Sequence, residues 1–141
     1  MDVDELVALI GGYDRVEVVV ASEEGGAPES AWGDVFFSLP GQPMGFATIV
    51  RSDYPGFDES SRLDREGVFR LNLAIGREAL RARVASGDDA PVDQAALDVL
   101  FPHPTYASHG WVSVLNPSST DEEVRELIAL AYERAVAKTD D

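Results

Sequence analysis

The sequence predicts a single α+β domain, residues 1–141, in which helices cover one face of an antiparallel sheet of about five strands. Residues 68–75 alternate with the period of a half-buried β-strand, with Arg70 and Asn72 on one face and four apolar side chains, Phe69, Leu71, Leu73 and Ile75, on the other. Three further strand candidates precede this segment and are joined to it by turns or loops, which is typical of an antiparallel meander. The C-terminal residues repeat apolar side chains at helical spacing, so they predict a helix that must bury one stripe against the sheet.

The N-terminal half supplies one helix and three strands. Apolar side chains recur at helical spacing over residues 3–10, and two glycines end that helix. Residues 16–21 are rich in valine, which favours a strand. Two more strands are joined by a turn with two prolines, which cannot donate ladder hydrogen bonds. These strands are expected over residues 34–39 and 45–51, and long loops over residues 22–33 and 52–64.

The C-terminal half supplies three helices and two strands. Pro91 is tolerated in the first turn of a helix, whereas Pro102 and Pro104 forbid its continuation. Residues 101–110 are therefore expected to be irregular. The elements expected after the alternating strand are helices over residues 77–85 and 91–100, a strand over residues 111–115 and a final helix.

The final helix has the most regular pattern of the chain. Thr120 is the expected N-cap and Glu123 follows three residues later, which matches a capping box. Arg134 and Lys138 lie where the negative end of the helix dipole favours cations. The apolar face is formed by Val124, Leu127, Ile128, Ala131 and Ala135, with Tyr132 beside it.

The composition is that of an ordinary globular protein, with 45% hydrophobic and 26% charged residues. Because the chain has no cysteine, disulfides, thiolate nucleophiles and thiolate metal sites are excluded. No apolar run approaches the roughly 18–20 residues that cross a bilayer, and the acidic first residues are unlike a signal peptide. A cytoplasmic location without membrane contact is therefore expected.

Charge is distributed unevenly along the chain. The net charge of −15 repels phosphate backbones, so binding to nucleic acid is disfavoured. Residues 51–83 nevertheless hold seven arginines and six acids, while the other 108 residues hold four bases and 20 acids. Two interpretations remain open for this segment: solvated partners of nearby carboxylates, or a surface facing an anion and centred on Arg65 and Arg70.

The polar face of residues 68–75 is the best candidate for a functional surface. Arg70 and Asn72 share that face, and a guanidinium can bind a carboxylate or phosphate through two hydrogen bonds. We expect a pocket over these two side chains, with residues 63–65 and the loop 103–111 as walls. The sequence therefore predicts a binding or interaction module for a small anionic or polar ligand or for a protein partner.

Catalysis is the alternative. His103 and His109 share one proline-bounded loop, and either could act as a general base near Asp64. A metal site would need a third ligand such as Asp64 or Asp98, which the sequence does not place, so no metal or cofactor is expected. No nucleophile elbow or phosphate-binding fingerprint occurs, and no catalytic residue is assigned. A loop-ordering role is favoured for His103 and Tyr106, through hydrogen bonds to the backbone.

Five short motifs are specific as a set, although none is a mechanistic signature. They are Phe46-Ala47-Thr48-Ile49-Val50, Leu63-Asp64-Arg65-x-Gly67-Val68-Phe69-Arg70-Leu71-Asn72, Pro102-His103-Pro104-x-Tyr106, Gly110-Trp111-Val112-x-Val114-Leu115-Asn116-Pro117 and Ala131-Tyr132. Together they resemble an uncharacterised family found mainly in actinobacteria, and the similarity covers residues 1–138.

More distantly, the order of elements resembles the MmcQ/YjbR-like fold, which is α+β with an antiparallel sheet. That resemblance rests on residues 71–73, on a closing Trp-Val-x-Val strand and on the aromatic Tyr132 in the helix that follows. Some MmcQ/YjbR-like proteins have been suggested to bind DNA, a function that the acidity of this chain argues against. The candidate ligand-binding residues are Arg65, Arg70, Asn72, His103, Tyr106, His109, Trp111 and Asn116.

Overall fold

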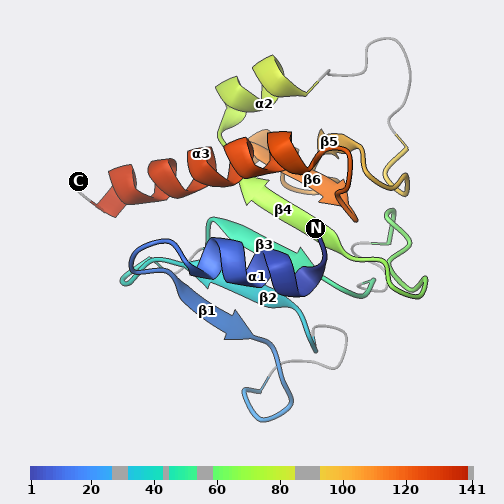
Figure 1. The fold of residues 1–141 in the computed structure, drawn as a ribbon, viewed down its shortest axis with the longest axis horizontal. Helices are drawn as coiled ribbons and strands as arrows, with labels where there is room; N and C mark the ends of the chain where they lie inside the picture. Colours follow the sequence, from blue (N-terminus) through green and yellow to red (C-terminus); the bar gives the residue numbers. More distant parts are fainter. Residues whose placement is uncertain (27–31, 43–44, 54–58, 85–92, 140–141) are drawn as a thin grey trace.

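The computed structural model describes residues 1–26, 32–42, 45–53, 59–84 and 93–139. Within these ranges the chain is α+β, with one open antiparallel sheet of six strands and three α-helices (Figure 1). The elements are, in order, α1 (Val3–Gly11), β1 (Glu17–Val20), β2 (Val35–Ser38), β3 (Ala47–Val50), β4 (Arg70–Ala74), α2 (Arg77–Arg83), β5 (Leu100–Pro102), the 3₁₀ turn η2 (Ala107–His109), β6 (Trp111–Leu115) and α3 (Asp121–Thr139).

The strand order is β1-β2-β3-β4-β6-β5, and every neighbouring pair is antiparallel. The first four strands form the expected meander. The last strand, β6, lies against β4, and the short β5 is the outer strand beyond β6. The expected count of about five strands was therefore one too low among the described residues.

The helix expected near residues 91–100 is wrong over residues 93–100, and residues 91 and 92 lie outside the described part. Asp98 has a positive φ of 60°, which an α-helix cannot accommodate. Its backbone N–H instead donates to the carbonyl of Leu115 at 2.6 Å, and Leu97 forms an isolated bridge with the same residue. Pairing with β6 thus replaces the local helical pattern, and the paired segment continues into β5.

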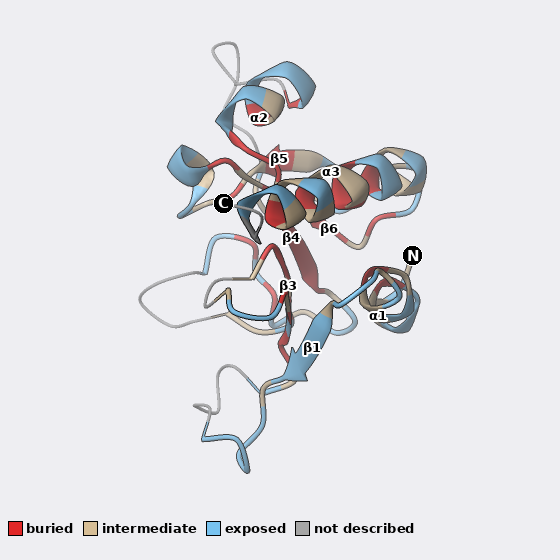
Figure 2. Cartoon of the chain, turned by 90° about the vertical axis from the view of Figure 1, so that its left-hand side faces the viewer, coloured by how far each residue is buried: buried red, intermediate tan, exposed pale blue. Residues whose placement is uncertain are grey.

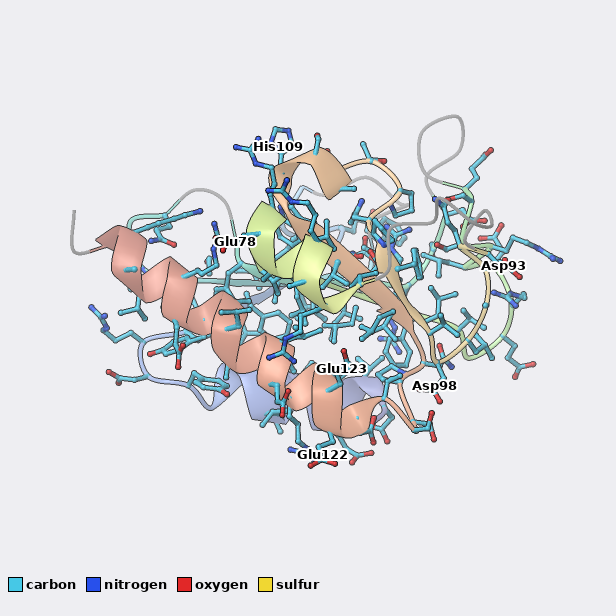
Figure 3. The ribbon with its side chains drawn as sticks, turned by 90° about the horizontal axis from the view of Figure 1, so that it is seen from above. Glu78, Asp93, Asp98, His109, Glu122 and Glu123 are labelled. Atoms are coloured by element: carbon cyan, nitrogen blue, oxygen red, sulfur yellow. The ribbon has the colours of Figure 1, made fainter. Side chains whose placement is uncertain are left out.

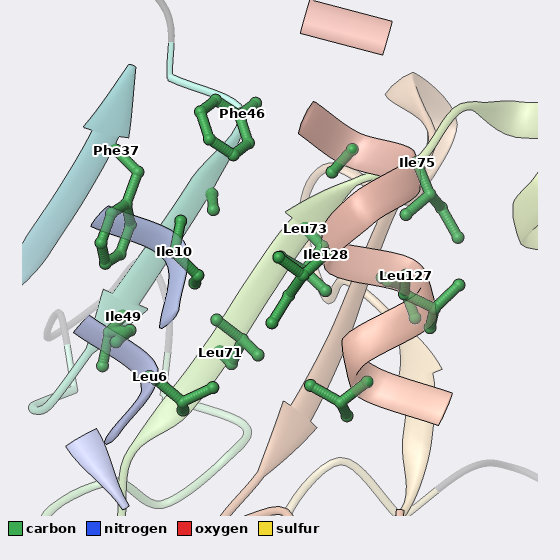
Figure 4. Packing of buried hydrophobic residues seen from close by; sticks show 14 of the residues in the cluster. Leu6, Ile10, Phe37, Phe46, Ile49, Leu71, Leu73, Ile75, Leu127 and Ile128 are labelled. Carbon is green, nitrogen blue, oxygen red and sulfur yellow. The ribbon is translucent and has the colours of Figure 1, made fainter. Parts of the chain in front are cut away.

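Helices α1 and α3 lie on the same side of the sheet, as the turned view shows (Figure 2). The alternation of β4 explains this, because Leu71 and Leu73 face the helices and are at most 1% exposed. Burying one such side chain stabilises the fold by about 1.5–3 kcal/mol. The predicted apolar face of α3 is confirmed, since Val124, Leu127, Ile128, Ala131 and Ala135 are all buried in this core (Figure 4).

The N-terminus of α3 is held by Asp98, on the segment that leads into β5 (Figure 3). The Asp98 carboxylate accepts from the hydroxyls of Ser119 and Thr120 at 2.5 and 2.7 Å. It also accepts from the backbone N–H groups of Ser118, Ser119 and Thr120 at 2.8–3.1 Å. The Ser119 hydroxyl, with these other donors, holds the pKa of Asp98 well below its ordinary value, although desolvation acts in the opposite direction. Thr120 does precede the helix as expected, but its hydroxyl hydrogen is given to Asp98.

Among the described residues, no helix combines the length and apolarity that crossing a membrane requires.

Candidate functional site

A row of polar side chains crosses the outer face of the sheet, defined here as the face opposite α1 and α3. Asn72 on β4 lies between Thr48 on β3 and Ser113 on β6 in the strand register. Its Nδ2 donates to the Thr48 hydroxyl at 3.0 Å, and its Oδ1 accepts from the Ser113 hydroxyl at 2.7 Å. One carboxamide therefore connects the side chains of three neighbouring strands.

Arg70 belongs to the same network. Its Nε donates to Oδ1 of Asn72 at 3.0 Å, and Nη1 donates to the Ser61 hydroxyl at 3.1 Å. Both Arg70 and Asn72 are only 1% exposed, so β4 is buried on both faces and the expected half-buried strand is wrong. A buried arginine is stable only when its donors are satisfied, and this network supplies such partners.

A cavity of about 900 Å³ lies over this outer face. Strands β2, β3, β4 and β6 form its floor, and the loop around η2 forms one wall. The C-terminal half of α3, which extends past the end of β4 (Figure 1), forms another. Viewed from above, η2 and His109 lie across the sheet from α3 and α1 (Figure 3). The aromatic, cationic and hydrogen-bonding side chains of the lining include Phe36, Arg70, Asn72, His103, Tyr106, His109, Trp111, Arg134 and Lys138.

The charges around the cavity are one-sided. Its described lining contains the cations Arg70, Arg134 and Lys138 and the imidazoles of His103 and His109, but no aspartate or glutamate. This is the reverse of the chain as a whole, which has 26 acids against 11 lysines and arginines. Cations that converge on a concave, partly apolar surface create a positive potential that is less screened than on an open surface.

The wall around η2 is ordered by His103. Its Nδ1 accepts from the backbone N–H groups of Thr105 and Tyr106 at 3.0 and 3.1 Å, so the loop-ordering role expected for this histidine is confirmed. Because Nδ1 is an acceptor in both bonds, the ring proton is assigned to Nε2. The imidazole also packs 5.0 Å from the Tyr106 ring and 6.4 Å from Trp111, measured between centroids. His103 therefore fixes the position of two aromatic side chains that line the cavity.

Two glycines join the η2 wall to α3. Gly110 lies against Gly76, so that a Cβ on Gly110 would be 2.5 Å from the carbonyl carbon of Gly76. A Cβ on Gly76 would in turn be 2.9 Å from Nε of Arg134. The Arg134 Nη1 donates to the carbonyl of Ala74 at 3.1 Å. Because Gly76 and Gly110 have no side chains, the guanidinium of Arg134 lies against Gly76, which in turn contacts Gly110, the residue after His109.

Arg65 and Asn116, also expected at the site, do not line this cavity. The Arg65 guanidinium donates to the carbonyls of Arg62, Ser61 and Ala95 at 2.8–3.0 Å, which fixes one loop to another. Asn116 accepts from the backbone N–H of Phe69 and donates to the carbonyl of Gly67, at 3.0 and 2.9 Å. Both side chains are therefore occupied with backbone groups near the start of β4.

Asp64 is also outside the cavity. It lines a separate hollow of about 540 Å³ between the N-terminus of α1 and residues 63–69, where Asp2, Asp4, Arg51 and Arg65 mix both signs of charge. The proposed pairing of Asp64 with a loop histidine therefore has no support from the arrangement of these groups. In the described part of the chain, no cluster of three or more histidine, aspartate or glutamate side chains could hold a metal ion.

The model of a family of unknown function, DUF6194, matches residues 1–141. The chain belongs to DUF6194. No curated protein and no solved structure matches it.

This DUF6194 chain carries site residues that the sequence interpretation missed. Thr48 and Ser113 hold Asn72, and the alternation of their strands places both on the outer face, so the strand period could have indicated them. Arg134 and Lys138 were interpreted only as partners of the helix dipole. Their position at the cavity depends on how α3 crosses the sheet, which periodicity within the helix does not specify.

Proposed function

We propose that this protein binds a small organic anion in the cavity on the outer face of the sheet. The observation that carries the proposal is the one-sided lining, in which three cations and two imidazoles occur without a carboxylate among the described residues. In a chain of net charge −15, such a surface selects for anions against the general repulsion of the molecule. The volume of about 900 Å³ lies within the range of about 300–1,000 Å³ typical of small-molecule sites.

The two ends of the lining suit different parts of a ligand. Arg134 and Lys138 come from the C-terminal half of α3 and suit a carboxylate or phosphate. Phe36 and Trp111 offer apolar surface along the floor, which suits an aromatic or aliphatic body. Arg70 is buried within the floor, where it adds positive potential and holds the polar row together. An amphiphilic anion therefore fits the site better than inorganic phosphate does.

Thermal-shift measurements with aryl carboxylates, alkyl carboxylates and phosphate monoesters test this proposal, with the corresponding neutral amides as matched controls. A ligand that binds only the folded state raises the melting temperature, and the stabilisation grows with the logarithm of the ratio of its concentration to Kd. We expect stabilisation by at least one organic anion and none by its amide. Lys138→Gln should weaken this stabilisation, because it removes one cation from the lining.

Arg81→Gln is the control variant for this experiment. It removes the same charge from an exposed position on α2 that lies outside the cavity lining. Equal loss of binding in Lys138→Gln and Arg81→Gln would show that only net charge matters and would contradict a defined site. Failure of every anion tested in the wild type would contradict the proposal itself.

We also propose that the fold is MmcQ/YjbR-like and that the protein acts in the cytoplasm. The first proposal is supported by the antiparallel sheet that closes with β6, the strand Trp111–Leu115, and is followed by a long helix. The second is supported by the acidic, cysteine-free composition. The strand order β1-β2-β3-β4-β6-β5 is the feature to compare with MmcQ/YjbR-like structures, and a different order there would contradict the assignment.

A further inference from the structure

Among the residues that the structure describes, the strand β1 is an edge of the sheet with no further strand beside it. It is the outermost strand beside β2, and each of its four residues is exposed (Figures 1 and 2). Val18, Val19 and Val20 are 39%, 57% and 55% exposed. An edge strand of this kind presents unpaired N–H and C=O groups together with β-branched side chains, which is the surface that pairs with another strand.

The opposite edge of the sheet is protected. There, β5 has only three residues and ends in Pro102, which has no N–H to donate. Proteins commonly protect edges with proline, lysine, a bulge or a very short strand. The strand β1, Glu17–Val20, has no proline, lysine or bulge, and its single charged residue, Glu17, lies at its first position. The two edges therefore differ in whether they are blocked against a further strand.

We propose that β1 pairs with β1 of a second copy of this chain, antiparallel, so that the two sheets become continuous. A two-fold axis perpendicular to the sheet keeps the helix-covered face on one side, and residues of the same face must then lie opposite one another. With the axis at Val19, Val19 lies opposite Val19 of the second copy, and Val18 lies opposite its Val20. All three exposed valines then pair with valine.

Neighbouring registers are less favourable. Moving the axis to Val20 leaves one valine pair, because Val18 and Val19 then lie opposite Ser22 and Ala21 of the second copy. Moving it to Val18 places Glu17 opposite Val19. In the register centred on Val19, all three exposed valines pair with valine, so side-chain pairing selects that register.

Cysteine cross-linking tests this register directly, because the natural chain has no cysteine. Opposed residues in an antiparallel pair have Cα atoms about 4.5–5.5 Å apart, which lies within the range that a disulfide spans. Val19→Cys should therefore form a disulfide-linked dimer under mild oxidation. Val18→Cys and Val20→Cys should each remain largely monomeric alone but should cross-link when mixed. Val99→Cys, which is 45% exposed near the other edge, measures random collision.

The mass of the unmodified protein, measured by light scattering, gives the second readout. We expect reversible dimers at protein concentrations up to about 1 mM. Salt should strengthen them, because each copy carries a net charge of −15 and salt screens the repulsion between the two. Val19→Lys should abolish them, since it sets two lysines opposite each other, whereas Val99→Lys adds the same charge elsewhere and should not. A wild type that stays monomeric at high salt overturns the proposal. So does equal cross-linking of all four cysteine variants, or dimers that Val19→Lys leaves intact.

Discussion

Arg70 and Asn72, two residues apart on β4, are joined side chain to side chain, with 3.0 Å between Nε and Oδ1. Both groups lie on the outer face, and each is only 1% exposed. The main role of Arg70 is therefore to stabilise the floor of the cavity, and any contact with a ligand is secondary. This makes a simple loss of binding a poor test of its role, because the fold depends on it as well.

We expect Arg70→Ala to destabilise the protein by about 2–4 kcal/mol, because it removes a buried hydrogen-bond partner from both Asn72 and Ser61. Urea unfolding measures this change. Arg81→Ala removes an exposed arginine from α2 and should stay within about 0.5 kcal/mol of the wild type. Similar values for the two variants would show that the buried network contributes nothing beyond charge.

Gly110→Ala should cost about 3 kcal/mol or more. The new Cβ would lie 2.5 Å from the backbone of Gly76, and Gly110 also has a positive φ of 84°. Gly67→Ala is the matched control, because Gly67 has a similar φ of 72° but no atom within 4 Å of the position that a Cβ would take. It should cost only about 1–2 kcal/mol, the strain of the left-handed backbone. Melting temperatures that fall equally in both variants would contradict a steric role for the Gly110–Gly76 contact.

Asp98→Asn should reduce stability at pH 7 by about 1–2 kcal/mol, since the neutral amide accepts the five N–H and O–H donors less well. Asparagine also tolerates the positive φ at this position, so backbone strain does not confuse the result. The folded-state pKa of Asp98 is lowered, so its contribution is complete above the unfolded pKa and is lost as pH falls through the folded value.

The difference between wild type and Asp98→Asn should therefore be constant at neutral pH and begin to shrink below about pH 4. Urea unfolding at a series of pH values measures it. A difference that is unchanged between about pH 7 and about pH 2, or one that grows as pH falls, would show that the carboxylate charge does not stabilise the start of α3.

Trp111 should report ligand binding by fluorescence. It lines the cavity. The sequence has two tryptophans, so the variant Trp32→Phe keeps Trp111 alone. We expect an organic anion that raises the melting temperature to change the emission of this variant, because a ligand replaces water beside the indole. The reciprocal variant Trp111→Phe, which keeps Trp32, should show no change. A response from Trp32 alone would place the binding site elsewhere.

Much of the fold could be predicted because its signals are local. The bounds of β6 and the apolar face of α3 follow from periods of two and 3.6 residues, which each segment carries within itself. The segment that became β5 carried a misleading signal. Just before β5, Leu97 and Asp98 pair with Leu115, which lies 17 residues beyond Asp98 in the sequence, and no local pattern predicts that contact.

The site shows the same division. The alternation of β4 predicts that Arg70 and Asn72 share a face, and the structure places His103, Tyr106, His109 and Trp111 around the same cavity. The alternation could not predict that Arg70 is buried, because burial depends on Ser61 and on the loop that carries it. For Arg134, the decisive factor is the close passage of two glycines, which is visible only in three dimensions.

The side-chain amide of Gln42 donates to the carbonyl of Ala135 at 2.9 Å, connecting the β2–β3 turn to α3. Gln42 is synthesised well before α3, yet residues from both line the cavity on the outer face. During translation the cavity therefore stays incomplete until α3 has been synthesised and has packed against the sheet. The set of lining side chains is complete only after α3 packs, so a ligand of this cavity should bind the complete chain more tightly than a shorter nascent chain.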